Sequence, residues 1–248
     1  RRIDELAIGG DTTAGYSYML RAGMGLFEAA RGMLPDPGRG EIAIVCGKGN
    51  NGGDGYVAGS LLLDTGYRTM CFGLCNPEEL SGEAGRAYRD YEARHGNALV
   101  ISDTGDLEGL SRYALIVDAL LGTGITGNPR GPVAEAIQAI NKAGVPVLAV
   151  DTPSGINNDT GEIGTPCIHA ATTVTMGFPK IGSFFYPAKS HVGTLVVREL
   201  GYPQEIVEQN HAGIFFPSPR KLRRMVPPRK PAGSKFDHGL VLMVCGSR

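Results

Sequence analysis

Short apolar runs alternate with stretches of helical periodicity along most of the chain. The apolar runs are rich in β-branched residues, which is typical of buried strands. They lie at residues 41–46, 68–74, 98–101, 114–118, 145–151, 171–176 and 194–199. The helical periodicity predicts helices at residues 14–33, 54–65, 77–95 and 131–143. This alternation predicts an α/β fold, a Rossmann-like three-layer sandwich with a mostly parallel sheet and helices on both of its faces.

The composition limits the classes of ligand. The chain has 248 residues, enough for one large domain or one domain with an appendage. Its 24 Lys and Arg against 25 Asp and Glu give a net charge of −1, which provides no general attraction for nucleic acid or an anionic membrane. An anionic ligand must therefore be held by local geometry. The 37 glycines predict tight turns or backbone pressed against a ligand.

The cysteines and the hydropathy indicate a cytoplasmic protein. There are five cysteines, an odd number without a C-x-x-C pair, and they are expected to be reduced. No run approaches about 18 apolar residues and no signal-peptide pattern opens the sequence, so neither membrane insertion nor secretion is expected. Because the sequence starts at Arg1 without a methionine, an upstream targeting segment stays open.

The last part of the chain differs in composition from the rest. Residues 213–234 hold five prolines and six basic residues, which favours a solvated linker over a nucleic-acid patch. Residues 235–248 contain one glycine-bounded apolar strand, which cannot bury both of its faces alone. We therefore predict a first domain at 1–212, a linker at 213–234 and the start of a further domain at 235–248.

Three polar loops follow predicted strands, at residues 47–55, 118–124 and 151–155. In an open parallel sheet, ligands bind beyond the carboxyl ends of the strands, where the strand order reverses. These loops are therefore the first candidates for a site.

The first loop contains G-x-G-x-x-G at Gly47, Gly49 and Gly52. An ordinary NAD-dependent oxidoreductase also needs an acidic residue at the end of the second strand, and residues 71–74 provide none. The P-loop pattern G-x-x-x-x-G-K-[ST] does not occur either. A generic phosphate cradle at a helix N-terminus and a merely tight, glycine-packed turn both remain.

The polar residues of this loop favour the ligand-binding alternative. A tight turn alone does not require two carboxamides and a carboxylate beside four glycines. The loop nevertheless contains Asn50, Asn51 and Asp54.

Asp118 and Asp151 each end a strongly apolar run, which places two carboxylates at one edge of the sheet. Either could be a turn or N-cap aspartate. Together with Asn51 and Ser154, however, they form a set of hard oxygen ligands suited to alkali or alkaline-earth cations and not to zinc. Ser154 does not lie in G-x-S-x-G, which disfavours a Ser-His-Asp hydrolase.

Lys180 follows another apolar run and precedes a glycine. It can be a surface lysine. If the strand delivers it to the same edge, it can instead act on protons or bind phosphate.

Four motifs occur in an order and spacing that resemble the NAD(P)H-hydrate epimerases, the YjeF N-terminal family. They are GNNGGDG at 49–55, VDALLGTG at 117–124, DTPSG at 151–155 and TMGFPKIG at 175–182. Residues 2–6 and 19–23 also resemble the opening helices of that family, and the similarity covers about residues 1–212.

The resemblance implies a Rossmann-like enzyme that interconverts the R and S epimers of hydrated NADH and NADPH. It implies one potassium ion per subunit, with Asn51, Asp118 and Ser154 as ligands. It also implies substrate contacts at Asn50, Asn51, Gly52, Gly53, Asp54, Gly122, Thr123, Gly124, Ile125, Thr126, Gly127, Asn128 and Asp151.

The residue chemistry suits this reaction. The epimerised carbon carries a hydroxyl next to the ring nitrogen, so it inverts by loss and return of hydroxide or by ring opening, and either route needs proton transfer. Asp151 is the candidate acid and base, with Lys180 as its partner. A monovalent cation would offset the repulsion between Asp118, Asp151 and the substrate pyrophosphate. The expected partner is a small molecule, with no nucleic acid and no membrane, and a homo-oligomer is left open.

The strand within residues 235–248 resembles the first strand of the ADP- or ATP-dependent NAD(P)H-hydrate dehydratases, a ribokinase-like family. This implies a bifunctional parent that epimerises the R form and dehydrates the S form. The alternative is a catalytically idle Rossmann-like module that binds a ligand or acts as a scaffold. Retention of Asn51, Asp118 and Asp151 together argues against that alternative.

Overall fold

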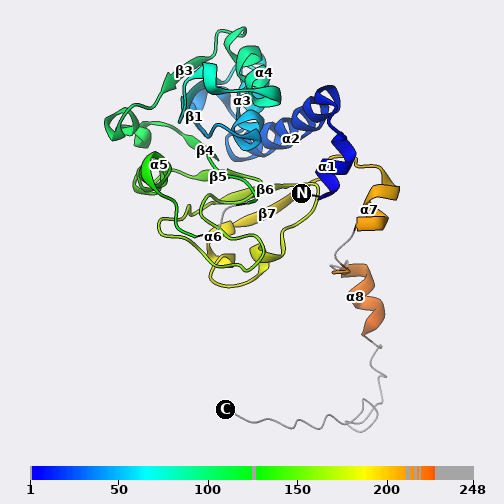
Figure 1. Ribbon diagram of the computed structural model, residues 1–248. Helices are drawn as coiled ribbons and strands as arrows, with labels where there is room; N and C mark the ends of the chain where they lie inside the picture. The colour runs from blue at the N-terminus through cyan, green and yellow to red at the C-terminus, as the bar shows by residue number, and fades with distance from the viewer. Residues whose placement is uncertain (1, 125–126, 211–212, 215–216, 218, 227–248) are drawn as a thin grey trace, which may run out of the picture. The chain divides into compact units, whose positions relative to one another are not determined.

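The computed structural model describes residues 2–124, 127–210, 213–214, 217 and 219–226 (Figure 1). The chain divides into two units, Arg1–Gln209 and Asn210–Arg248. The sheet and the candidate site belong to the first unit. The predicted opening of a further domain at 235–248 lies outside the described residues, and the predicted domain boundaries stay predictions.

The second unit contains a short helix, α8 (Pro219–Met225), within the segment that the sequence predicts to be a linker. A proline at the first helical position followed by Lys, Leu and Arg favours a helix locally. Composition alone therefore missed this element.

The first unit is built on a seven-stranded sheet in which every pair of neighbouring strands is parallel. The order is β3-β2-β1-β4-β5-β6-β7. The strands are β1 (Glu41–Cys46), β2 (Arg68–Gly73), β3 (Asn97–Val100), β4 (Leu115–Ala119), β5 (Val147–Val150), β6 (Thr172–Met176) and β7 (Thr194–Arg198). Their ends differ from the predicted ones by no more than two residues, and the predicted α/β fold is confirmed.

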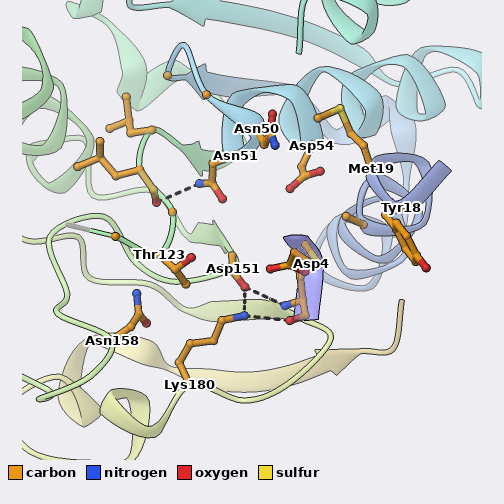
Figure 2. Close-up of a pocket in the computed structure, with 18 of the residues that line it drawn as sticks. Asp4, Tyr18, Met19, Asn50, Asn51, Asp54, Thr123, Asp151, Asn158 and Lys180 are labelled. Carbon is orange, nitrogen blue, oxygen red and sulfur yellow. Dashed lines mark hydrogen bonds and ion pairs between the residues drawn. The ribbon is translucent and has the colours of Figure 1, made fainter. Parts of the chain in front are cut away.

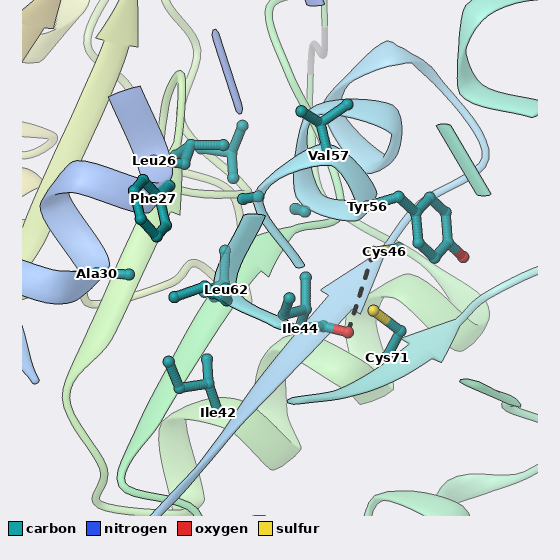
Figure 3. Packing of buried hydrophobic residues seen from close by; sticks show 14 of the residues in the cluster. Leu26, Phe27, Ala30, Ile42, Ile44, Cys46, Tyr56, Val57, Leu62 and Cys71 are labelled. Carbon is teal, nitrogen blue, oxygen red and sulfur yellow. Dashed lines mark hydrogen bonds between the residues drawn. The ribbon is translucent and has the colours of Figure 1, made fainter. Parts of the chain in front are cut away.

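Helices cover both faces of this sheet. The helices of the first unit are α1 (Arg2–Ile8), α2 (Thr12–Met33), α3 (Asn50–Asp64), α4 (Gly82–Glu92), α5 (Gly131–Lys142), α6 (Lys189–Val192) and α7 (Gln204–Asn210). Side chains of β1 alternate between two cores, as a strand buried on both faces requires. Ile42 and Ile44 pack with Leu26 of α2 and Val57 of α3 (Figure 3). Val45, on the other face, packs with side chains of α5.

The helix α3 begins at Asn50, four residues before its predicted start. A Cβ on Gly47 would lie 2.0 Å from the carbonyl oxygen of Leu120, and one on Gly52 would lie 2.0 Å from the carbonyl oxygen of Gly47. Glycine at both positions therefore lets the helix start close against the sheet. The polar residues 50–54 form the first turn of a helix, not a loop.

The helix predicted at 77–95, in contrast, is shorter than expected. A 3₁₀ turn at Pro77–Glu79 precedes α4, and Gly82, at the start of α4, has a φ of +56°. This conformation favours glycine and separates the two segments. None of the helices in the described ranges combines the length and the apolar character that crossing a membrane requires.

Candidate functional site

A cavity of about 1220 Å³ lies in the first unit, at the carboxyl ends of the strands. The strand order reverses between β1 and β4, so the loops that follow these strands diverge and leave a crevice. Segments after β1, β4, β5 and β6 line it, together with α1 and α2 (Figure 2). The sequence-predicted residues on its wall are Asn50, Asn51, Asp54, Gly122, Thr123, Gly124, Asp151 and Lys180.

Asp151 follows β5 directly and has a φ of +62°, which is strained for a residue with a side chain. The N–H of Thr152 bonds to the carbonyl oxygen of Val150 at 2.6 Å, which closes a tight turn around Asp151. The carboxylate oxygen Oδ1 of Asp151 accepts the N–H of Met176 at 2.9 Å. This turn directs a largely buried carboxylate to the cavity wall.

The ammonium of Lys180 forms an ion pair with Oδ1 of Asp151. It also donates to the carbonyl oxygen of Met176 at 2.9 Å and to Oγ1 of Thr175 at 3.1 Å. The side chains of Lys180 and Asp151 are only 18% and 12% exposed. Lys180 is therefore not a surface lysine, and it holds the carboxylate of Asp151 in one orientation.

Asp54 extends from the first turns of α3 toward the same space, on the wall that faces Asp151 (Figure 2). Burial, followed by repulsion from Asp151, raises the pKa of Asp54 well above its usual range, and the Lys180 ammonium opposes this rise. Asp4 adds further repulsion. Asp54 therefore binds its proton more tightly than an ordinary aspartic acid.

Asp118, one of the predicted cation ligands, is completely buried at the end of β4. Its carboxylate accepts three hydrogen bonds, from the N–H of Ser154 at 2.8 Å, the hydroxyl of Ser154 at 2.7 Å and the N–H of Leu120 at 3.3 Å. All three donors are neutral. Burial raises the pKa of Asp118 to about 6, although these hydrogen bonds oppose the rise.

The three predicted cation ligands meet around Leu121. Nδ2 of Asn51 donates to the carbonyl oxygen of Leu121 at 3.0 Å, and the N–H of Leu121 donates to Oγ of Ser154 at 3.1 Å. Oδ1 of Asn51 would lie 3.3 Å from a Cβ on Gly122, so the carbonyl side of this amide faces that glycine. Hard oxygen donors beside a buried carboxylate without a cationic hydrogen-bond partner are chemically suited to an alkali cation.

Four predicted contact residues lie away from the cavity wall. Gly52 packs against Gly47, and a Cβ on Gly53 would lie 2.5 Å from the terminal methyl carbon of Met19. Gly127 and Asn128 lie farther along the loop after β4. Oδ1 of Asn128 accepts the N–H of Thr165 at 2.9 Å. Ile125 and Thr126 lie outside the described residues.

An aromatic wall built from distant segments was not predicted from the sequence. The hydroxyl of Tyr202 donates to Asp4 of α1, and its ring centroid lies 5.1 Å from that of Tyr18 and 6.1 Å from that of Phe178. Burial and the hydrogen bond to Asp4 raise the pKa of Tyr202. Resemblance of residues 2–6 and 19–23 to opening helices was the only available signal for this wall.

Asn158 is a further wall residue that the sequence did not single out. Both polar atoms of its side-chain amide are buried, and neither has a hydrogen-bond partner among the described residues. Such a group is costly in a native protein and requires an explanation.

Comparison with known proteins places this site in context. The family described as YjeF-related protein N-terminus matches residues 15–182. The NAD(P)H-hydrate epimerase of Rhodopirellula baltica is 34% identical over 209 residues, which make up 84% of each chain. The bifunctional NAD(P)H-hydrate repair enzyme Nnr of Thermofilum pendens is 37% identical over 210 residues, 83% of this chain and 39% of that enzyme.

The bifunctional NAD(P)H-hydrate repair enzyme Nnr of Moorella thermoacetica is 39% identical over 210 residues, 83% of this chain and 40% of that enzyme. The chain thus spans about 40% of the length of these bifunctional relatives. Among solved structures, the yeast protein ynu0 (YNL200c) has the same fold, with a TM-score of 0.71 at 24% identity over 88% of this chain and 94% of the yeast chain.

Proposed function

The chain belongs to the family of YjeF-related protein N-terminal domains, and from this premise we propose that it interconverts the R and S epimers of hydrated NADH and NADPH. The observation that carries the proposal is Asp151, whose backbone is strained and whose carboxylate pairs with Lys180 at the wall of a cavity of about 1220 Å³. The names of the relatives support the same activity. An idle module would not need to maintain this strain.

In the proposed reaction, Asp54 and Asp151 transfer protons on the two faces of the hydrated ring. Asp54 donates its proton to the C6 hydroxyl, the C–O bond breaks, and water leaves while the nitrogen lone pair forms a C=N bond. A water molecule then adds to C6 from the opposite face and gives its proton to Asp151, and the C=N electron pair returns to nitrogen. The carbon is inverted. Before the next turnover, Asp54 regains a proton from solvent and Asp151 releases one to solvent. The reverse reaction exchanges the two roles.

This route requires one protonated and one ionised carboxyl group. Burial favours the protonated form of Asp54, and Lys180 pairs with the carboxylate of Asp151 and orients it. Lys180 is a positioning residue in this scheme. Ring opening at the N1–C6 bond would instead need a base that takes the proton of the C6 hydroxyl and an acid that protonates N1.

We also propose that Asn51, Asp118 and Ser154 hold a potassium ion. When bound, the ion supplies positive charge that compensates the buried carboxylate and the phosphates of the substrate. The residues themselves prearrange the floor of the cavity through Leu121.

The remaining proposals concern the parent protein. The bifunctional relatives are much longer than the region they share with this chain, which supports a parent with a second activity. From the resemblance of residues 235–248, we propose that this activity is a dehydratase (lyase) activity dependent on ADP or ATP. Four described cysteines are free, which supports a cytoplasmic location. Assembly into a homo-oligomer stays a prediction.

The test is the rate at which the purified chain equilibrates the two hydrate epimers, compared with the spontaneous rate, in potassium chloride and in choline chloride. We expect acceleration that depends on potassium. A rate equal to the spontaneous one in both salts would favour the idle module. Anomalous scattering from rubidium-soaked crystals tests the cation site separately, because absence of a peak between the three side chains would refute that site alone.

A further inference from the structure

The amide of Asn158 is an unexplained polar group on the cavity wall. Its Nδ2 and Oδ1 are both buried without a hydrogen-bond partner in the described ranges, whereas the neighbouring amide of Asn157 is used. Oδ1 of Asn157 accepts the N–H groups of Asp159 and Thr160 at 3.0 and 3.2 Å. Asn157 therefore stabilises the turn, whereas the side chain of Asn158 is left with one donor group and one acceptor that have no partner.

The backbone fixes where this amide lies. The carbonyl oxygen of Asn158 accepts the N–H of Gly182 at 2.8 Å, and a Cβ on Gly182 would lie 2.7 Å from that oxygen. Gly182 is two residues after Lys180, which pairs with Asp151. The loop that carries Asn158 is therefore fastened to the turn that carries Lys180. Figure 2 shows Asn158 on the same side of the cavity as Lys180, with its amide directed toward Thr123.

The unfilled groups define the chemistry of the missing partner. Nδ2 needs an acceptor and Oδ1 needs an N–H donor, and one ligand group that offers both side by side is a primary carboxamide. We propose that Asn158 binds the carboxamide of the hydrated nicotinamide ring in an amide-to-amide pair, an inference that rests on the proposed function. Nδ2 donates to the carboxamide oxygen, and the carboxamide N–H donates to Oδ1.

This contact would orient the reacting ring. The carboxamide is attached to the ring whose C6 is inverted, so a pair at Asn158 fixes the rotation of that ring relative to Asp151 and Asp54. The edge of adenine also offers an adjacent donor and acceptor. The attachment of Asn158 to the Lys180 turn favours the reacting end of the substrate over the adenine end.

The test changes residue 158 and the carboxamide of the substrate separately and together, and compares the effects, as in a double-mutant cycle. The substrates are the hydrates of NADH and of reduced 3-acetylpyridine adenine dinucleotide, in which an acetyl group keeps the acceptor and lacks the N–H donor. The enzymes are the wild type and Asn158→Leu, with Asn158→Ala as the second variant if the leucine variant does not fold. Epimerisation gives kcat/KM for each pair, and calorimetry gives the affinity for ADP-ribose.

We expect the wild type to prefer the carboxamide substrate by about tenfold or more, because the acetyl analogue leaves Oδ1 unfilled. The variant should lose that preference to within about twofold and bind ADP-ribose as the wild type does. A variant that keeps the preference overturns the contact, and weakened ADP-ribose binding with the preference retained assigns Asn158 to adenine instead. A wild type that accelerates neither hydrate overturns the proposed function and this contact with it.

Discussion

Replacement of Asp118 by asparagine should stabilise the protein in the absence of potassium and remove its response to potassium. The carboxylate of Asp118 is completely buried, and its hydrogen-bond donors are all neutral. Asparagine has nearly the same shape and carries no charge. The substitution therefore isolates the free-energy cost of the buried charge.

The expected size follows from the pKa of Asp118. Burial raises this pKa from its ordinary value of 3.8 to about 6, so the folded chain binds a proton that the unfolded chain releases between about pH 4 and 6. The contribution of Asp118 to the free energy of unfolding is highest below pH 4 and falls as the pH rises through 6. At about 1.36 kcal/mol per pH unit, the loss is about 3 kcal/mol.

The asparagine side chain also has one hydrogen-bond acceptor oxygen fewer than the aspartate carboxylate. The side chain of Asp118 takes N–H groups of Ser154 and Leu120 on different oxygens, and an amide can accept on one oxygen only. That loss costs about 1 kcal/mol. At pH 8 without potassium, Asp118→Asn should therefore be about 2 kcal/mol more stable than the wild type, whereas at pH 4 it should be slightly less stable.

Urea unfolding of both proteins in choline chloride, from pH 4 to pH 8, measures this difference. Repeating the series in potassium chloride should raise the free energy of unfolding of the wild type alone, by about 2.7 kcal/mol at a potassium concentration one hundred times Kd. A difference between the two proteins that does not change with pH would refute the assigned charge cost. Equal stabilisation of both proteins by potassium would refute Asp118 as a ligand.

Three further predictions follow from the geometry. Asp151→Asn should lower kcat by about 10²–10⁴-fold in the epimer assay, and a rate within about threefold of the wild type would remove Asp151 from the mechanism. Because burial raises the pKa of Asp54, deprotonation of this carboxyl is expected to lower kcat of the wild type at high pH. Asp54→Asn should abolish that decline. A wild-type pH profile in this variant would exclude Asp54 as the acid. Gly47→Ala should lower the free energy of unfolding by about 2 kcal/mol or more in urea, because its Cβ would lie 2.0 Å from the carbonyl oxygen of Leu120. Gly49→Ala is its control, with no atom within 4 Å of the new Cβ, and equal losses in the two variants would contradict the packing argument.

The strands and the site edge could be predicted from the sequence because both depend on local pattern. A continuous apolar run such as residues 41–46 reads as a buried parallel strand, and polar residues directly after such runs must lie at the carboxyl edge. The start of α3 could not be predicted in this way. Its first turn holds asparagines and glycines of low helix propensity, and the close packing that favours Gly53 involves Met19 and Ala84, which are distant in the sequence.

The aromatic wall and the orphaned amide are tertiary features. Tyr202 and Asp4 are 198 positions apart, so nothing in either local sequence indicates their contact. The unfilled state of Asn158 depends on where every neighbouring donor and acceptor lies. A local pattern can identify a polar residue, but only the folded chain shows whether its hydrogen bonds are satisfied.

The segment after β5 contains or contacts several groups whose arrangement is unfavourable for folding. Within eight residues, Asp151 has a strained backbone, Ser154 donates to the buried carboxylate of Asp118, and the side-chain amide of Asn158 has no hydrogen-bond partner in the described ranges. The strained backbone of Asp151, the buried charge of Asp118 and the unfilled amide of Asn158 each cost folding free energy, and all three lie at or beneath the same cavity wall. A sequence selected for stability alone would place glycine at 151 and an apolar side chain at 158. With the proposed cation bound at Asp118 and the proposed carboxamide bound at Asn158, the second and third costs would be compensated. The segment should therefore gain most of its stability when the ligands bind, and protection from hydrogen exchange should increase there first.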